Sequence, residues 1–271
     1  MPSDEVIVAF SVIFVLEAIT IIVGNTFTIF VFWSQRLYYK RTCFLLINLA
    51  IADLLVGLAE FIFLATKSIP GSLSSAFQTF ASRTSMSFLA LISMERAYTV
   101  LWPVQHRVIR NRVYVYGIII VWSLGLWAFP VLMLGMYYIK KNMLFLIIPI
   151  TSLSLISLLL ICVSYLAIRT RLRFTPLEIE SHNRQSTERN LRLSRTFFVV
   201  AALSLVFWLP AFEVYIIGDF CRPCISPTGV SIVKVMHLAK SVVNPIVFSF
   251  RMPIFQDLFN RLWRRRWRQI S

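Results

Sequence analysis

The sequence predicts an all-α membrane protein, a seven-transmembrane helix bundle with a short amphipathic cytoplasmic helix after the seventh span. Three observations favour this class. Apolar residues make up 58% of the chain and charged residues only 14%, whereas soluble domains are about a quarter charged. The apolar residues gather in seven runs, each close to the roughly 20 residues that cross a bilayer. Most of the 27 Lys and Arg lie in a few segments between those runs.

The seven apolar runs define the expected spans. The third run is the least apolar, because it carries many serines and threonines together with Gln78 and Arg83. A helix this polar is stable in a membrane only when other helices cover it, so we expect it at the centre of the bundle. In order, the expected spans are Val6–Trp33, Cys43–Thr66, Leu73–Leu101, Val113–Tyr138, Leu144–Ile168, Thr196–Ile217 and Pro227–Phe250.

Basic residues alternate between the two sides of the predicted membrane. They concentrate in segments 36–41, 107–112, 169–195 and 251–268, while the intervening loops carry few. This asymmetry follows the positive-inside rule. It predicts a multi-pass plasma-membrane protein with an extracellular N-terminus, a cytoplasmic C-terminus, and basic loops facing the anionic inner leaflet of the bilayer. The net charge of +15 therefore indicates membrane topology, and we expect no nucleic-acid partner.

Two regions are expected along the chain: a transmembrane domain at residues 1–250 and an amphipathic, basic cytoplasmic tail at 251–271. In the tail, Ile254, Phe255, Leu258 and Phe259 recur at spacings of three and four before a run of arginines. This pattern is typical of a helix on a membrane surface, and a disordered basic tail is the alternative. The polar segment 170–195 is expected to extend the fifth and sixth helices into the cytosol.

The four cysteines divide by compartment. Cys221 and Cys224 fall in the last outer loop, where oxidation is favoured, so we expect a disulfide between them. Cys43 and Cys162 lie in predicted spans and are interpreted as packing residues. The three histidines fall in three different regions, and no catalytic or metal-binding constellation is recognisable. We therefore expect no enzyme activity, no cofactor and no metal.

Ordered motifs on different spans carry the strongest signal. A Glu95-Arg96 pair ends the third span, and an ion pair at that depth must be neutralised internally or face water. The other motifs are Gly24-Asn25, Leu49-Ala50-Ile51-Ala52-Asp53, Trp122, Phe207-Trp208-Leu209-Pro210 and Asn244-Pro245-Ile246-Val247-Phe248. Together they resemble the landmarks of rhodopsin-like (class A) G-protein-coupled receptors over nearly the whole chain. The absence of a third-helix cysteine, a very short second outer loop, a second helix without proline, and the cysteine pair in the third outer loop resemble the melanocortin, adenosine, cannabinoid and lysophospholipid receptor branch.

The resemblance implies a receptor that converts binding of an extracellular small or peptide ligand into activation of a heterotrimeric G protein. Trp208 and Pro210 are the implied conformational toggle. Ala97 and Phe248 replace the customary tyrosines, so the alternative is a non-coupling receptor that sequesters ligand or partners another receptor. A transporter or channel ranks third. The residues implied in coupling and activation are Glu95, Arg96, Tyr165, Asn244, Pro245 and Phe248.

Asp53 lies near the middle of the membrane and so needs a partner. In receptors of this kind a sodium ion is often that partner, but this chain has Lys240 where a neutral polar residue is usual. Our hypothesis is that the Lys240 ammonium pairs with Asp53 and replaces the ion. The polar core equivalent to a sodium site then comprises Asn25, Asp53, Ser85, Lys240, Ser241 and Asn244.

The outer cavity is expected to bind a polar or zwitterionic ligand, because its residues carry mixed charges. Arg83 either contacts the ligand or pairs with an acidic neighbour, Glu60 or Glu213. A retinal-binding lysine is not expected, since Leu238 stands at that position. The candidate ligand-binding residues are Glu60, Gln78, Ser82, Arg83, Glu213, Tyr215, Lys234 and His237, with Trp208 at the base of the cavity.

Overall fold

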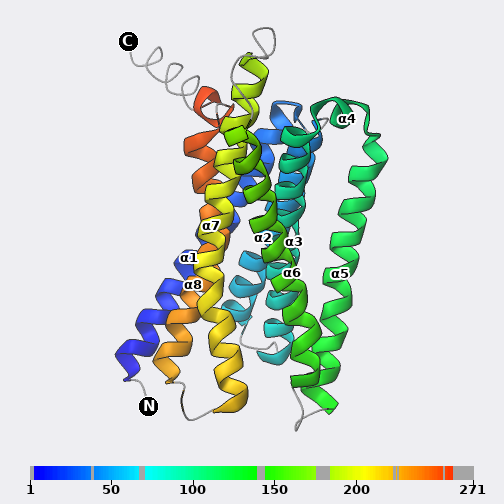
Figure 1. Cartoon of the computed structure of the whole chain (residues 1–271). Coiled ribbons are helices and arrows are strands. Elements are labelled where there is room, and N and C mark those ends of the chain that lie inside the picture. Colours follow the sequence, from blue (N-terminus) through cyan, green and yellow to red (C-terminus); the bar gives the residue numbers. More distant parts are fainter. Residues whose placement is uncertain are drawn as a thin grey trace, which may run out of the picture.

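The computed structural model describes residues 3–37, 40–66, 71–138, 144–174, 184–221, 224, 226–252 and 254–258. The described residues form eight labelled helices and no strand (Figure 1). These helices are α1 (Asp4–Ser34), α2 (Arg41–Thr66), α3 (Gly71–Leu101), α4 (Pro103–Val108), α5 (Asn111–Tyr138), α6 (Leu144–Phe174), α7 (Arg184–Phe220) and α8 (Pro227–Arg251).

Seven of the helices are long and lie roughly side by side, and α4 is a short helix at one end of the bundle (Figure 1). The start of α1 and the start of α8 lie at the opposite end from α4 (Figure 1). The polar helix α3 contacts α2, α5, α6 and α7, and α8 contacts α1, α2 and α7. The expected central position of α3 is therefore confirmed, because its neighbours cover its polar side chains.

Local sequence explains several helix ends. Ser226 caps α8 by accepting a hydrogen bond from the Gly229 amide (3.0 Å), and Pro227 occupies the first helical position. At the other end of the chain, α1 stops where Arg36 adopts a positive φ of 51°, the left-handed conformation that commonly closes a helix. Pro103 starts α4 in the same way that Pro227 starts α8.

The surface is apolar where a membrane would surround it. Large side chains such as Leu16 on α1, Ile120 on α5 and Leu159 on α6 are each more than half exposed. Five helical segments of the described residues are long and apolar enough to cross a membrane: Asp4–Ser34, Arg41–Thr66, Ser152–Arg171, Leu193–Pro210 and Pro227–Arg251. The buried polar side chains lie on the inside of the bundle instead, which is the arrangement expected of a membrane protein.

The expected spans all fall within long helices, and the differences lie at their ends. The helices α6 and α7 run beyond the apolar runs, to Phe174 and from Arg184, as the polar segment predicted. The helix α4 was not predicted. Residues 254–258 are helical as expected, but Phe255 is fully buried against Phe27 and Phe32 of α1, with ring centroids 6.2 and 5.6 Å apart. This part of the tail therefore packs on the bundle, where the Phe255 ring is fully covered by α1 and its neighbours.

The expected disulfide between Cys221 and Cys224 is present, with Cα atoms 5.3 Å apart. It follows α7 and precedes α8, at the end of the bundle opposite α4 (Figure 1). Cys43 is buried, in agreement with its interpretation as a packing residue, whereas Cys162 is exposed on α6. Among the described residues, no group of three His, Cys, Asp or Glu side chains is placed to hold a metal ion.

Candidate functional site

Buried and partly buried polar side chains form three clusters along the bundle. The central cluster comprises Asn25, Asp53, Ser82, Ser85, Lys240, Ser241 and Asn244, drawn from α1, α2, α3 and α8. The α4-end cluster comprises Arg41, Thr42, Glu95, Arg96, His106 and Tyr114. The opposite-end cluster comprises Glu17, Glu60, Gln78 and Lys234.

Asp53 is the centre of the central cluster and has no exposed surface. Its two carboxylate oxygens accept hydrogen bonds from α8: the Ser241 hydroxyl donates to Oδ1 at 2.7 Å, and the Asn244 amide donates to Oδ2. The Asn25 amide of α1 donates to the Ser241 carbonyl at 3.2 Å. The carboxylate thus joins α2 to α8, and Asn25 extends the contact to α1.

Lys240 is also fully buried, but it does not bond directly to Asp53. Its ammonium donates to the carbonyl oxygen of Ser82 at 2.8 Å and to the Ser82 hydroxyl at 3.2 Å, both on α3. The expected direct pair is therefore replaced by an indirect arrangement. Ser241 and Asn244 bond to the carboxylate, while the ammonium bonds to α3. It remains close enough to Asp53 for electrostatic attraction. The buried hydroxyl of Ser85 lies beside Asp53 as well.

At the α4 end, Glu95 and Arg96 form a close ion pair. Arg96 Nε lies 2.6 Å from Glu95 Oε2, and Arg96 Nη2 lies 2.9 Å from Oε1. The Thr42 hydroxyl of α2 donates to Glu95 Oε1 at 3.1 Å and also accepts from Arg96. The pair is less than one-tenth exposed. Arg96 is therefore held against α2 and α3, with its guanidinium 5.7 Å from the Phe197 ring of α7.

The short helix α4 is attached to this ion pair. His106 of α4 places Nε2 3.3 Å from Glu95 Oε1 and 2.9 Å from the Tyr114 hydroxyl of α5. Arg41, at the start of α2, donates to the carbonyl oxygens of His106 (2.8 Å) and Ile109 (2.6 Å) and to Asn111 Oδ1 (2.9 Å). The loop that follows α3 is thus bound to both α2 and α5.

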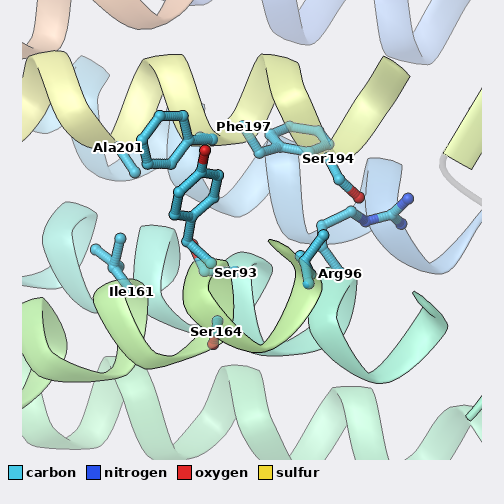
Figure 2. A pocket seen from close by; sticks show the side chains of 10 residues that line it. Ser93, Arg96, Ile161, Ser164, Ser194, Phe197 and Ala201 are labelled. Atoms are coloured by element: carbon cyan, nitrogen blue, oxygen red, sulfur yellow. The ribbon is translucent and has the colours of Figure 1, made fainter. Parts of the chain in front are cut away.

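A small cavity separates α3, α6 and α7 beside Arg96 (Figure 2). The cavity volume is about 20 Å³, enough for one water molecule. Tyr165 of α6 lines this cavity and stacks on Phe198 of α7, with centroids 3.5 Å apart. The structure therefore brings Tyr165 and Arg96 to one cavity. Phe248 of α8 is buried and packs edge-on against Phe197, with centroids 6.2 Å apart.

One proline lies inside α7 and another inside α8. Pro210 lies within α7, two residues after the buried Trp208, and Pro245 lies within α8 beside Asn244. Each proline removes one backbone hydrogen bond from its helix and favours a kink. Pro245 also contacts α1 closely, since a side chain at Gly24 would come within 2.9 Å of it.

The opposite-end cluster joins α2, α3 and α8. The Lys234 ammonium lies 2.8 Å from Glu60 Oε1, and the Gln78 amide donates to Glu60 Oε2 at 3.0 Å. Lys234 also lies over the rings of Phe14 (4.7 Å) and Phe63 (5.5 Å). Glu60 is buried, whereas Lys234 retains about a third of its side-chain exposure. The cluster is therefore an ion pair with one accessible partner.

The remaining candidate ligand residues are distributed around this cluster. Arg83 of α3 donates to the Ser154 hydroxyl of α6 at 2.5 Å. Its suggested pairing with Glu60 is not formed, and Lys234 and Gln78 bond to that carboxylate instead. His237 lies on α8 one turn from Lys234, with Nδ1 buried. The side chains of Glu213 and Tyr215 lie outside the described part of the chain.

Sequence reasoning missed Glu17 and His106. Glu17 of α1 interacts electrostatically with Glu60 and Lys234, and its Oε2 is buried without a hydrogen-bond partner among the described residues. A carboxylate inside the most apolar run was a usable signal, because ionisable residues within spans usually have a function. His106 had no such signal, since only the folded loop places it beside Glu95.

The bundle and its internal polar clusters define a membrane protein built from seven long helices. The sequence matches the family of seven-transmembrane receptors of the rhodopsin type over residues 24–248. The chain belongs to this family. It is 26% identical to human lysophosphatidic acid receptor 3, over 86% of this chain and 75% of that protein.

Other similar proteins agree with this assignment. The octopamine receptor beta-1R of Drosophila melanogaster is 24% identical over 89% of this chain, which spans 58% of that receptor's length. Squid rhodopsin shares the fold, with a TM-score of 0.84 and 16% identity over 97% of this chain and 87% of the rhodopsin chain. The expected fold class and family are thereby confirmed, and the protein is a multi-pass membrane protein.

Proposed function

We propose that this receptor converts binding of an extracellular ligand into activation of a heterotrimeric G protein. The observation that carries the proposal is the Glu95–Arg96 ion pair, which is buried at the α4 end and bonded to α2 through Thr42 and to α4 through His106. A buried ion pair is costly to break one partner at a time, so it can hold one state of a two-state bundle.

The orientation follows from charge. Arg107, Arg110 and Arg112, the basic end of α6, and Arg251 all belong to the α4 end. By the positive-inside rule this end is cytoplasmic, which makes the N-terminus extracellular. Outward movement of α7 about Pro210 would release Phe197 from Arg96 and enlarge the cavity shown in Figure 2. That movement would admit a segment of the G protein.

We assign ligand binding to the opposite-end cluster and to the two phenylalanines beside it, Phe14 and Phe63. Glu60, Lys234 and Glu17 offer both signs of charge, and Phe14 and Phe63 add aromatic surface. A ligand carrying a cationic and an anionic group could exchange with the Glu60–Lys234 pair. Such a ligand would pull on α2 and α8, the two helices that Asp53 also joins.

Guanine-nucleotide exchange tests the proposal. The purified receptor is incubated with each of several G proteins and a panel of peptides, nucleosides, amines and lysophospholipids. Ligand-stimulated exchange that is lost in Arg96→Ala and retained in Arg195→Ala would support coupling. Saturable ligand binding with no exchange on any G protein would indicate the non-coupling alternative, a receptor that sequesters ligand or partners another receptor.

A further inference from the structure

A basic cleft lies at the α4 end, outside the clusters described above. It has a volume of about 670 Å³ and lies where α4 ends and α5 begins, beside the start of α2. The cleft is shallow and open, so a ligand bound there would stay partly exposed. Four arginines line the cleft: Arg41, Arg107, Arg110 and Arg112. Val108, Ile109 and Asn111 complete the lining, which contains no acidic side chain among the described residues.

The floor of the cleft is ordered before any ligand arrives. Arg41 makes three hydrogen bonds, to His106 O, Ile109 O and Asn111 Oδ1, and its guanidinium lies 5.4 Å from the Tyr114 ring. These bonds define the path of the backbone between α4 and α5. A pre-organised backbone lowers the entropy cost of ligand binding.

The other three arginines remain available. Arg107, Arg110 and Arg112 are exposed, and no described residue forms an ion pair with them. The first turn of α5 begins at Asn111 and adds the positive end of a 28-residue helix. Guanidinium groups bind phosphate oxygens through two parallel hydrogen bonds. The chemistry of the cleft therefore suits a ligand with more than one phosphate.

Apolar side chains next to the cleft indicate that the phosphates belong to a lipid. Val104 and Val108 of α4 are 75% and 79% exposed, and Trp102 is 49% exposed. Exposed tryptophan and aliphatic residues beside arginines are typical of a segment at the membrane interface. A soluble phosphate would gain nothing from these side chains, whereas the acyl chains of a lipid would cover them.

We propose that this cleft binds the phosphorylated inositol headgroup of a lipid in the cytoplasmic leaflet. Basic pockets on the cytoplasmic side of membrane helices bind such headgroups. The assignment rests on the proposed function only for the side of the membrane, because the cleft itself does not depend on G-protein coupling.

The test uses the purified full chain in detergent micelles, where both ends are accessible, with a short-chain fluorescent phosphatidylinositol bisphosphate as the probe. The variant Arg107→Gln/Arg110→Gln/Arg112→Gln should lose about tenfold or more in affinity, since each phosphate-facing arginine contributes measurably. The matched control Arg169→Gln/Arg173→Gln/Arg251→Gln removes the same charge from exposed arginines on α6 and α8 and should bind within about twofold of wild type.

Competition separates the possible sources of phosphate. Unlabelled short-chain phosphatidylinositol bisphosphate should displace the probe, and short-chain phosphatidylserine should displace it only weakly. Equal loss of affinity in the two triple variants would overturn the proposal in favour of general charge attraction. Displacement by free inositol trisphosphate as strong as by the lipid would overturn the lipid assignment. If the cleft triple variant unfolds at a lower temperature than wild type, the single variant Arg107→Gln replaces it, with Arg173→Gln as control. None of these outcomes depends on a receptor ligand or a G protein.

Discussion

At the scale of single residues, Lys240 is the side chain that departs most from its surroundings. It is fully buried inside the bundle, and it bonds to Ser82 on α3 while remaining near Asp53. A cation at this position opposes the entry of another cation by charge repulsion and by occupying space. We therefore infer that the ammonium takes the role that a sodium ion would have beside Asp53.

The first prediction concerns Lys240→Asn. Wild-type protein should unfold at the same temperature in sodium chloride and in choline chloride at equal ionic strength. The asparagine variant should gain about 2–4 °C in sodium, because ion binding to the folded state near ten times its Kd stabilises it by roughly 1.4 kcal/mol. Lys240→Met, which fills the space without charge or polar ligands, should show no gain. Sodium-dependent unfolding of the wild type would contradict the inference.

A second prediction concerns Trp122, whose indole Nε1 donates to Asn48 Oδ1 at 3.0 Å and joins α5 to α2. Trp122→Phe should lower the free energy of unfolding by about 1 kcal/mol, since the amide oxygen loses its donor. Thermal unfolding of the purified receptor measures the change. In the Trp122→Phe background, Asn48→Ala should cost less than it does alone, because the shared bond is already lost. Additive losses would show that the two side chains do not interact.

At the scale of helices, close approach between α3 and α5 depends on Gly125. A Cβ atom at Gly125 would collide with the Thr84 hydroxyl and come within 3.1 Å of the Phe80 ring. Small residues allow such contacts between membrane helices. Gly125→Ala should therefore destabilise the protein by about 1–3 kcal/mol. Gly117→Ala on the same helix is the control, since its Cβ meets only Leu91 Cδ2 at 3.3 Å. Equal unfolding temperatures for the two variants would refute the argument.

The short helix α4 is held in place by hydrogen bonds from Arg41 at the start of α2. Arg41 donates to the carbonyl oxygens of His106 and Ile109, and a glutamine there could not reach both. Arg41→Gln should therefore loosen α4, and trypsin should cleave after Arg107 and Arg110 several times faster, because proteolysis follows local opening. Mass spectrometry of the fragments measures the rates. Cleavage after Arg173 on α6 is the internal control, and a uniform acceleration at all three sites would indicate global destabilisation instead.

At the scale of the whole molecule, the proposed switch depends on the Glu95–Arg96 pair. Glu95→Gln removes the charge that holds Arg96 while keeping the size of the side chain. Unstimulated nucleotide exchange should rise several-fold in this variant, since releasing one partner of a buried pair costs the closed state roughly 3–5 kcal/mol at most. Glu60→Gln should leave unstimulated exchange unchanged and reduce only the ligand response. Unaltered basal and stimulated exchange in both Glu95→Gln and Asp53→Asn would show that this polar line has no part in signalling.

The number of spans could be predicted from the sequence because hydropathy and charge act locally. An apolar run long enough to cross a bilayer must form a helix, since no other conformation lets a single segment satisfy all its backbone hydrogen bonds in lipid. The motifs around Asp53, Arg96 and Asn244 could also be recognised, because each is a short run of residues and their order can be read from the sequence without knowing how the helices pack. The central place of α3 followed from its polarity, because a polar helix must be covered.

The tertiary structure decided which polar groups bond to each other. Lys240 faces Ser82 instead of Asp53, Glu60 bonds to Lys234 instead of Arg83, and Glu17 joins them from α1. Each of these pairings depends on how one helix is rotated about its axis relative to its neighbour. Hydropathy says little about that rotation. The position of α4, with His106 beside Glu95 and Arg41 in the lining of a basic cleft, likewise depends on contact with the start of α2, which lies 65 residues before His106. Sequence therefore determined the family and its spans, and packing determined the pairings that give this receptor its own chemistry.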